Sequence, residues 1–184
     1  MVSRNASAYE RELRYLLEGD GGSVRAYARA LPPPDRPEFE HLTEAPFLVI
    51  RGAGSLGFDL VALRRDYAFP LEVKASAEPV IRFTAASGRA EAQLAAHRSA
   101  VQRVGLTVLY AYRRIGRQKE EPWRIFLGSS VPQRGVLKGV CSHLPHVSAT
   151  AQGHGVLRWE EGMPLSKFLH YAYYFEAPPA PPPP

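Results

Sequence analysis

Two apolar runs decide the fold of this chain: Phe58-Asp59-Leu60-Val61-Ala62-Leu63 and Pro70-Leu71-Glu72-Val73-Lys74, with a polar turn between them. Each run predicts a buried β-strand, and the short link predicts a hairpin. Side chains two apart on a strand share a face, so Glu72 and Lys74 point the same way while Leu71 and Val73 point into the core. A hairpin that brings Asp59 alongside Glu72 would gather two carboxylates and an ammonium at one point.

Charged side chains inside apolar strands need a physical reason. An unpaired buried charge costs several kcal/mol, so such strands rarely carry two carboxylates and a lysine. Hard divalent cations prefer carboxylate oxygens, and Mg²⁺ usually takes one or two carboxylates together with substrate phosphate. Asp59, Glu72 and Lys74 therefore predict metal-assisted phosphodiester hydrolysis. The alternative is structural: Asp59 caps a turn, and Glu72 and Lys74 pair with each other on an edge strand.

The composition sets broad limits on the class of protein. The 184 residues suit one domain with elaborations, and 45% hydrophobic residues are ordinary for a globular protein. No apolar run approaches the roughly 20 residues of a membrane span, and no signal-peptide pattern opens the chain, so we expect a cytoplasmic protein without a membrane partner. The single cysteine, Cys141, excludes an intramolecular disulfide.

The positive charge favours an anionic partner. The net charge is +5 and the pI is about 9.5. Most of the basic residues are arginines, whose planar fork suits phosphate oxygens. Codon bias in a GC-rich genome would produce the same excess of arginine, so the charge alone decides little.

Hydrophobic periodicity predicts the other elements. An amphipathic helix is expected over residues 5–18, with Tyr9, Leu13, Leu16 and Leu17 on its buried stripe. Prolines predict an inserted loop at about 20–46, with a short helical turn at 24–31. Further expected elements are strands at 47–51, 106–112 and 123–127, and helices at 87–104 and 165–175. We expect a nuclease core over 1–130 and a C-terminal extension over 131–184, whose Pro-rich tail 177–184 should be extended or disordered.

Asp59, Glu72 and Lys74 match the D-x(n)-E-x-K pattern of the PD-(D/E)xK nuclease superfamily. Together with Tyr9-Glu10-Arg11-Glu12-Leu13, Val49-Ile50-Arg51 and Ala53-Gly54-Ser55, they make the chain resemble the archaeal-type Holliday junction resolvases, the Hjc family. The resemblance covers roughly residues 5–19 and 47–130. It implies an α/β fold, with a restriction-endonuclease-like mixed central β-sheet flanked by helices. It also implies a homodimeric, Mg²⁺-dependent endonuclease, without a nucleotide cofactor, that nicks four-way DNA junctions in symmetric pairs.

The same resemblance suggests catalytic roles. Asp59 and Glu72 would be the main metal ligands, joined by the Val73 carbonyl and by Glu10 from the first helix, and Mn²⁺ would substitute for Mg²⁺. Lys74 would orient the attacking water or stabilise charge that develops on the phosphate. Glu10 has an alternative role, because Ser7 and Glu10 fit a capping box.

The resemblance also suggests contacts to DNA. Ser55 matches a position near the scissile phosphate, and Arg11 and Arg51 match basic positions around the site. Tyr112 stands where relatives often carry a lysine, so Arg113 and Arg114 would supply that contact, displaced along the strand. Their alternatives are ordinary: Ser55 forms a turn, and the arginines are solvated surface residues.

The leading hypothesis is therefore a resolvase that acts on branched DNA. A different PD-(D/E)xK nuclease, of the restriction or repair type, is the first alternative. The second is a branched-DNA-binding protein without catalytic activity. Cys141, His143, His146 and His154 do not match the spacing of a zinc motif, so we interpret them as residues of a loop with incidental histidines.

Overall fold

The computed structural model describes residues 6–52, 57–84, 90–116, 120–128, 132 and 134–176. Within them, the elements follow one another as α1 (Ala6–Leu17), α2 (Gly21–Arg29), the 3₁₀ turn η1 (Pro33–Asp35), α3 (Pro37–His41), β1 (Leu48–Arg51), β2 (Leu60–Arg64), β3 (Tyr67–Ser76), β4 (Val80–Phe83), α4 (Ala90–Val104), β5 (Leu109–Arg114), β6 (Trp123–Leu127), α5 (Gly135–Cys141), β7 (Ser148–Ala149), β8 (Gly155–Arg158), the 3₁₀ turn η3 (Trp159–Glu161), β9 (Met163–Pro164) and α6 (Leu165–Tyr174).

A six-stranded mixed sheet forms the centre, in the order β1-β2-β3-β5-β6-β9. The β2–β3 hairpin is antiparallel with Leu60 opposite Leu71, which confirms the predicted hairpin. Strand β3 then pairs in parallel with β5, with Leu71 opposite Leu109, because β4 and α4 carry the chain across between them. The predicted α/β class, a mixed central sheet flanked by helices, is confirmed.

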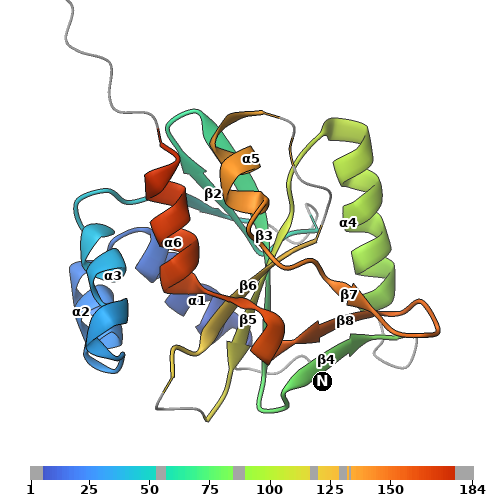
Figure 1. Cartoon of the computed structure of the whole chain (residues 1–184), viewed down its shortest axis with the longest axis horizontal. Helices are drawn as coiled ribbons and strands as arrows, with labels where there is room; N and C mark the ends of the chain where they lie inside the picture. The colour runs from blue at the N-terminus through green and yellow to red at the C-terminus, as the bar shows by residue number, and fades with distance from the viewer. Residues whose placement is uncertain are drawn as a thin grey trace, which may run out of the picture.

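Two hydrophobic cores lie on opposite faces of this sheet. Figure 1 shows α1, α2, α3 and α6 on one side, and α4 with the small β4-β8-β7 sheet on the other. The first core joins the predicted stripe of α1 to the sheet and α6, with Leu13, Phe69 and Phe168 all at most 1% exposed. The second core packs Tyr110 and Tyr112 of β5 against Leu94 of α4 and the small sheet.

The prediction of a loop at 20–46 is wrong, because this stretch contains α2, η1 and α3, although the helical turn predicted at 24–31 overlaps α2. The Asp20 side chain caps α2 by accepting the backbone N–H of Ser23 at 2.8 Å. Pro37 stands in the first turn of α3, where its missing N–H costs nothing. Phe39 and Leu42 are completely buried, so the segment adds to the first core.

Other elements were not predicted at all. Strand β4 was overlooked although Val80-Ile81-Arg82-Phe83 is a short β-branched and aromatic run, and α5, β7 and β8 lie in a stretch without clear periodicity. The predicted helix at 165–175 is confirmed as α6, and β9 extends the large sheet beside β6. Where a domain boundary lies stays a prediction, and the tail 177–184 lies outside the described residues. In the described part of the chain, no helix has the length and apolar character to cross a membrane.

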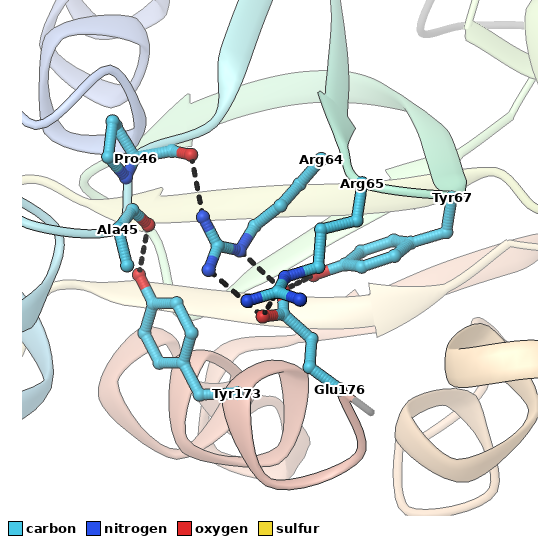
Figure 2. Close-up of polar contacts among 7 residues, drawn as sticks. All are labelled: Ala45, Pro46, Arg64, Arg65, Tyr67, Tyr173 and Glu176. Carbon is cyan, nitrogen blue, oxygen red and sulfur yellow. Dashed lines mark hydrogen bonds and ion pairs between the residues drawn. The ribbon is translucent and has the colours of Figure 1, made fainter. Parts of the chain in front are cut away.

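A charged clamp ties the C-terminal end of α6 to the β2–β3 hairpin (Figure 2). Both carboxylate oxygens of Glu176 accept hydrogen bonds from the Arg64 guanidinium, with Nη2 2.9 Å from Oε2. The same carboxylate accepts a hydrogen bond from the Tyr67 hydroxyl at 2.9 Å. Arg65 adds a second guanidinium, 3.0 Å from Oε2. The Arg64 and Glu176 side chains are only 11% and 6% exposed, so each needs the other as a counter-charge.

Replacing Glu176 with Gln should therefore destabilise the fold by about 3 kcal/mol, because the buried Arg64 guanidinium loses its counter-charge. Urea denaturation measures the change. Glu161→Gln is the matched control: its pair with Arg158 spans 3.6 Å between half-exposed side chains, and its loss should cost below about 1 kcal/mol. Equal effects of the two substitutions would contradict a buried clamp.

Candidate active site

Asp59 lies one residue before β2, and the structure turns its side chain toward β3. Its backbone N–H donates to the Leu71 carbonyl at 3.1 Å, so Asp59 is bonded to β3 just before the regular pairing that starts at Leu60. Its Oδ2 accepts the backbone N–H of Val73 at 2.7 Å. Gly52 donates to the Asp59 carbonyl at 2.8 Å, and a Cβ on Gly52 would overlap the Phe58 carbonyl oxygen. The backbone thus holds Asp59 between β1 and β3.

Glu72 and Lys74 share the face of β3 that α4 covers, as the alternation of the strand predicts. Lys74 Nζ lies 2.6 Å from Glu72 Oε1 and 3.2 Å from the side-chain oxygen of Gln93 in α4. The Glu72 side chain is only 3% exposed, and its second oxygen, Oε2, is buried without a hydrogen-bond partner. A buried oxygen left in this state is costly unless a proton or a cation reaches it.

Burial raises the pKa of Glu72 to about 7. The nearby ammonium of Lys74 lowers it, and the negative charge of Asp59 raises it further. The Glu72 carboxyl therefore changes charge close to neutral pH, which is unusual for a glutamate and typical of functional sites.

Glu10 approaches the same place from α1. Burial raises its pKa, and the charge of Asp59 adds to this effect. The positive charge of Arg51, at the end of β1, lowers the pKa of Glu10; its Nη2 lies 3.6 Å from Glu10 Oε2. Ser7 lies inside the first turn of α1, which begins at Ala6, so the alternative capping box is not formed.

The residue types at this site suit a hard cation such as Mg²⁺. Carboxylate oxygens are its preferred protein ligands, and the partnerless Oε2 of Glu72 offers one of them. Two other carboxylate oxygens already accept hydrogen bonds: Asp59 Oδ2 from the Val73 N–H, and Glu72 Oε1 from the Lys74 ammonium. Among the residues that the structure describes, no group of three or more His, Cys, Asp or Glu side chains is close enough to hold a metal ion.

The basic residues fall into two groups. Arg51 stands beside Glu10, and Arg11 is exposed on α1. Arg114 lies on the Glu72 side of the sheet, opposite Ser76, and its Nε and Nη1 atoms are buried without a hydrogen-bond partner. Arg113 points to the other side of the sheet.

Ser55, which was predicted to lie near the scissile phosphate, is outside the described residues.

Arg113 belongs to a structural cluster under α1. Its Nε lies 2.9 and 3.1 Å from the two carboxylate oxygens of Glu12, and its guanidinium lies over the Tyr9 ring. Trp123 donates its ring N–H to the same carboxylate at 3.0 Å. Glu12 is thus held by the core-facing side of β5 and β6, whereas Glu10 faces Asp59 and Arg51.

Two site neighbours from α4 were missed in the sequence. Gln93 contacts Lys74, and His97, one helical turn later, contacts the segment before Asp59 through the Gly57 carbonyl. Their spacing of four places both on one face of the helix. Polar residues in an Ala-rich helix are common, so this spacing carried no specific signal before the packing of α4 was known.

Comparisons with known proteins leave the family open. No protein-family model matches the sequence, and no curated protein matches it. Among solved structures, the chain is similar to Hjc from Archaeoglobus fulgidus, a Holliday junction resolvase from an archaeal hyperthermophile. The sequence identity is 17%, the match covers 71% of this chain and 87% of that chain, and the TM-score is 0.43.

The raised pKa of Glu72 predicts a pH dependence of stability. Between about pH 4.5 and 7 the folded chain binds more protons than the unfolded chain, so stability should fall as pH rises through this window. Glu121, whose pKa is also raised to about 7 by burial, acts in the same direction. In urea unfolding from pH 4.5 to 8, Glu72→Gln and Glu121→Gln should each flatten the slope. A slope that only Glu121→Gln flattens would mean that Glu72 is ionised throughout.

Proposed function

We propose that this chain is a Mg²⁺-dependent DNA endonuclease that resolves four-way junctions by symmetric paired nicks. The observation that carries the proposal is the state of Glu72: a buried carboxylate with Lys74 on one oxygen, no partner on the other, and Asp59 nearby. Most buried side-chain oxygens of folded proteins have a hydrogen-bond partner, so a partnerless Oε2 is unusual for a purely structural ion pair. This state favours chemistry over the alternative in which Glu72 and Lys74 merely pair on a strand.

Asp59, Glu72 and Glu10, with the Val73 carbonyl, would hold the metal ion in this proposal. When bound, Mg²⁺ or a substituting Mn²⁺ supplies Lewis-acid activation of a water and charge stabilisation on the phosphate. Before binding, Glu72 accepts or releases a proton close to neutral pH because burial raises its pKa to about 7. The site would therefore load its metal more readily as pH rises above neutrality.

Lys74 is the group best placed to act on the reacting phosphate. Its ammonium is held by Glu72 and Gln93, so its position does not depend on the substrate. A cation fixed in advance beside the reacting oxygens stabilises developing negative charge without reorganisation. Arg51, 59% exposed at the rim of the site, would hold a substrate phosphate together with Arg11.

Branched DNA is the proposed partner. The net charge of +5 and the exposed arginines suit contacts to the phosphate backbone, which position DNA without reading its bases. Selectivity for a four-way junction would come from a homodimer, because two equivalent sites match the two-fold symmetry of the junction. A restriction- or repair-type nuclease remains the alternative among enzymes, and a non-catalytic junction-binding protein remains the alternative among binding proteins.

Cleavage of a synthetic four-way junction, beside a linear duplex of the same sequence and with Mg²⁺, tests the proposal. The parent protein should nick the junction in pairs and spare the duplex. Asp59→Asn should abolish cleavage, and Lys74→Met should slow it by about 100- to 1,000-fold, since it removes one fixed positive charge. Arg158→Gln, which changes an exposed residue in β8, is the control and should cleave normally.

Three other outcomes would redirect the proposal. Cleavage of the duplex at a fixed sequence would favour the restriction-type alternative. Tight junction binding without cleavage in Mg²⁺ or Mn²⁺ would favour the binding protein. Cleavage unaffected by Asp59→Asn would place the active site elsewhere.

The salt dependence of junction binding separates the two groups of arginines. Each lost phosphate contact should lower the slope of log K against log salt by about 0.9 on duplex arms. Arg51→Gln should show this decrease at unchanged stability. Arg113→Gln should keep the slope and lower stability, because Arg113 is held by Glu12 inside the fold. Fluorescence anisotropy at several salt concentrations gives the slopes, and the reverse pattern would contradict our assignment.

A further inference from the structure

His97 is a buried histidine in α4 that the proposed chemistry does not use. Its side chain lies in the contact between α4 and the large sheet, and the residue is only 2% exposed. One ring nitrogen, Nε2, is bonded to the Gly57 carbonyl, and the other, Nδ1, lies 2.8 Å from the Tyr110 hydroxyl. The ring stacks on Phe58, with centroids 4.5 Å apart and 25° between the planes. A single imidazole thus contacts both residues that precede Asp59.

The partners of His97 fix its tautomer. A carbonyl oxygen only accepts hydrogen bonds, so Nε2 must carry a hydrogen and donate it to Gly57. Burial lowers the pKa of His97, which favours the neutral ring. In a neutral ring with hydrogen on Nε2, Nδ1 accepts, and the Tyr110 hydroxyl donates to it. The bonds therefore run in one direction, from Tyr110 through the imidazole to Gly57.

This chain of bonds ends where the backbone needs support. Gly57 has φ of 74°, in the left-handed region that favours glycine, so the chain turns sharply just before Asp59. Asp59 itself is bonded to β3, through its backbone N–H to the Leu71 carbonyl and through its carboxylate to the Val73 N–H. His97 holds the two residues that precede Asp59, Gly57 and Phe58. Without it, the turn at Gly57 would have one fewer constraint on the direction in which the Asp59 side chain leaves the backbone.

We propose that His97 is a positioning residue that holds the Gly57–Asp59 segment so that the Asp59 carboxylate stays against Val73. The positioning itself is a property of the fold. Its consequence for catalysis rests on the proposed nuclease function. Both ring nitrogens of His97 are engaged, one by Gly57 and the other by Tyr110, so the ring acts on Asp59 through the backbone and not on a substrate.

Three variants separate the hydrogen bond from the packing. His97→Phe keeps a flat ring beside Phe58 and removes the donor to Gly57. His97→Gln keeps a terminal N–H near the position of Nε2 and should restore the bond. Trp159→Phe is the matched control, because it removes another buried ring N–H, which donates to the Pro122 carbonyl at 2.9 Å in the same second core.

Hydrogen exchange of the Val73 amide is the primary measurement, since this amide is protected by Asp59. In His97→Phe, the exchange rate of the Val73 amide should rise roughly fivefold or more relative to the amides of β6. This is the effect that loss of one hydrogen bond has on local opening. His97→Gln should exchange like the parent, and so should Trp159→Phe after correction for global stability. Equal protection of Val73 in His97→Phe and Trp159→Phe would overturn the proposal, as would exchange in His97→Gln as fast as in His97→Phe.

Junction cleavage is the second measurement. His97→Phe should lower kcat with little change in KM, and His97→Gln should recover it, whereas Trp159→Phe should keep both. Faster Val73 exchange in His97→Phe with full cleavage would overturn the catalytic consequence. If the parent protein does not cleave DNA at all, the nuclease proposal fails while the exchange data still decide whether His97 positions Asp59.

Discussion

The pairing of β3 on both sides is the constraint on which the rest of the structure depends. Strand β3 pairs antiparallel with β2 and parallel with β5, so its pleat cannot shift without moving every neighbour. This register sends Leu71 into the first core and Glu72 toward α4. A slip by one residue would exchange the two faces and bury two charged side chains in the first core. The site is thus as well determined as the hairpin itself.

Two buried glutamates differ in how their carboxylate oxygens are satisfied. Burial raises the pKa of both Glu72 and Glu121 to about 7. Both oxygens of Glu121 are satisfied by Ser166, through its backbone N–H at 2.9 Å and its hydroxyl at 2.6 Å. Glu72 has an ammonium on one oxygen and no hydrogen-bond partner on the other. Similar pKa values therefore accompany different hydrogen bonding, which distinguishes the two residues.

Much of this architecture follows from patterns within single elements. The stripe of α1, the hairpin and the strand at 123–127 were predictable, because each buries a periodic set of apolar side chains. Helix α2 was predicted only as a short turn, and α3 was not predicted, because Pro37 at a helix start resembles a proline in a loop until Phe39 is known to be buried. Strand β4 was missed because its partner β8 lies more than 70 positions later, beyond any local pattern.

The site shows the same division. The spacing of Asp59, Glu72 and Lys74 predicted their approach, since all three depend on one hairpin. Gln93 and His97 depend on how α4 packs, which no spacing within the helix reveals. Arg113 and Arg114 are neighbours in sequence but face opposite sides of the sheet. Alternation of side chains along β5 predicts that the two arginines face opposite sides. Which of them faces the site follows only from the parallel pairing of β5 with β3.

The clamp at Glu176 has a consequence for synthesis of the chain on the ribosome. Arg64 emerges 112 residues before the glutamate that neutralises it, a delay of roughly 5 to 20 s at ordinary translation rates. During that time the hairpin beside the site lacks the carboxylate that neutralises the Arg64 guanidinium in the finished fold. The nascent chain therefore has a built-in order of maturation, in which the hairpin reaches its final stability only after α6 has been made.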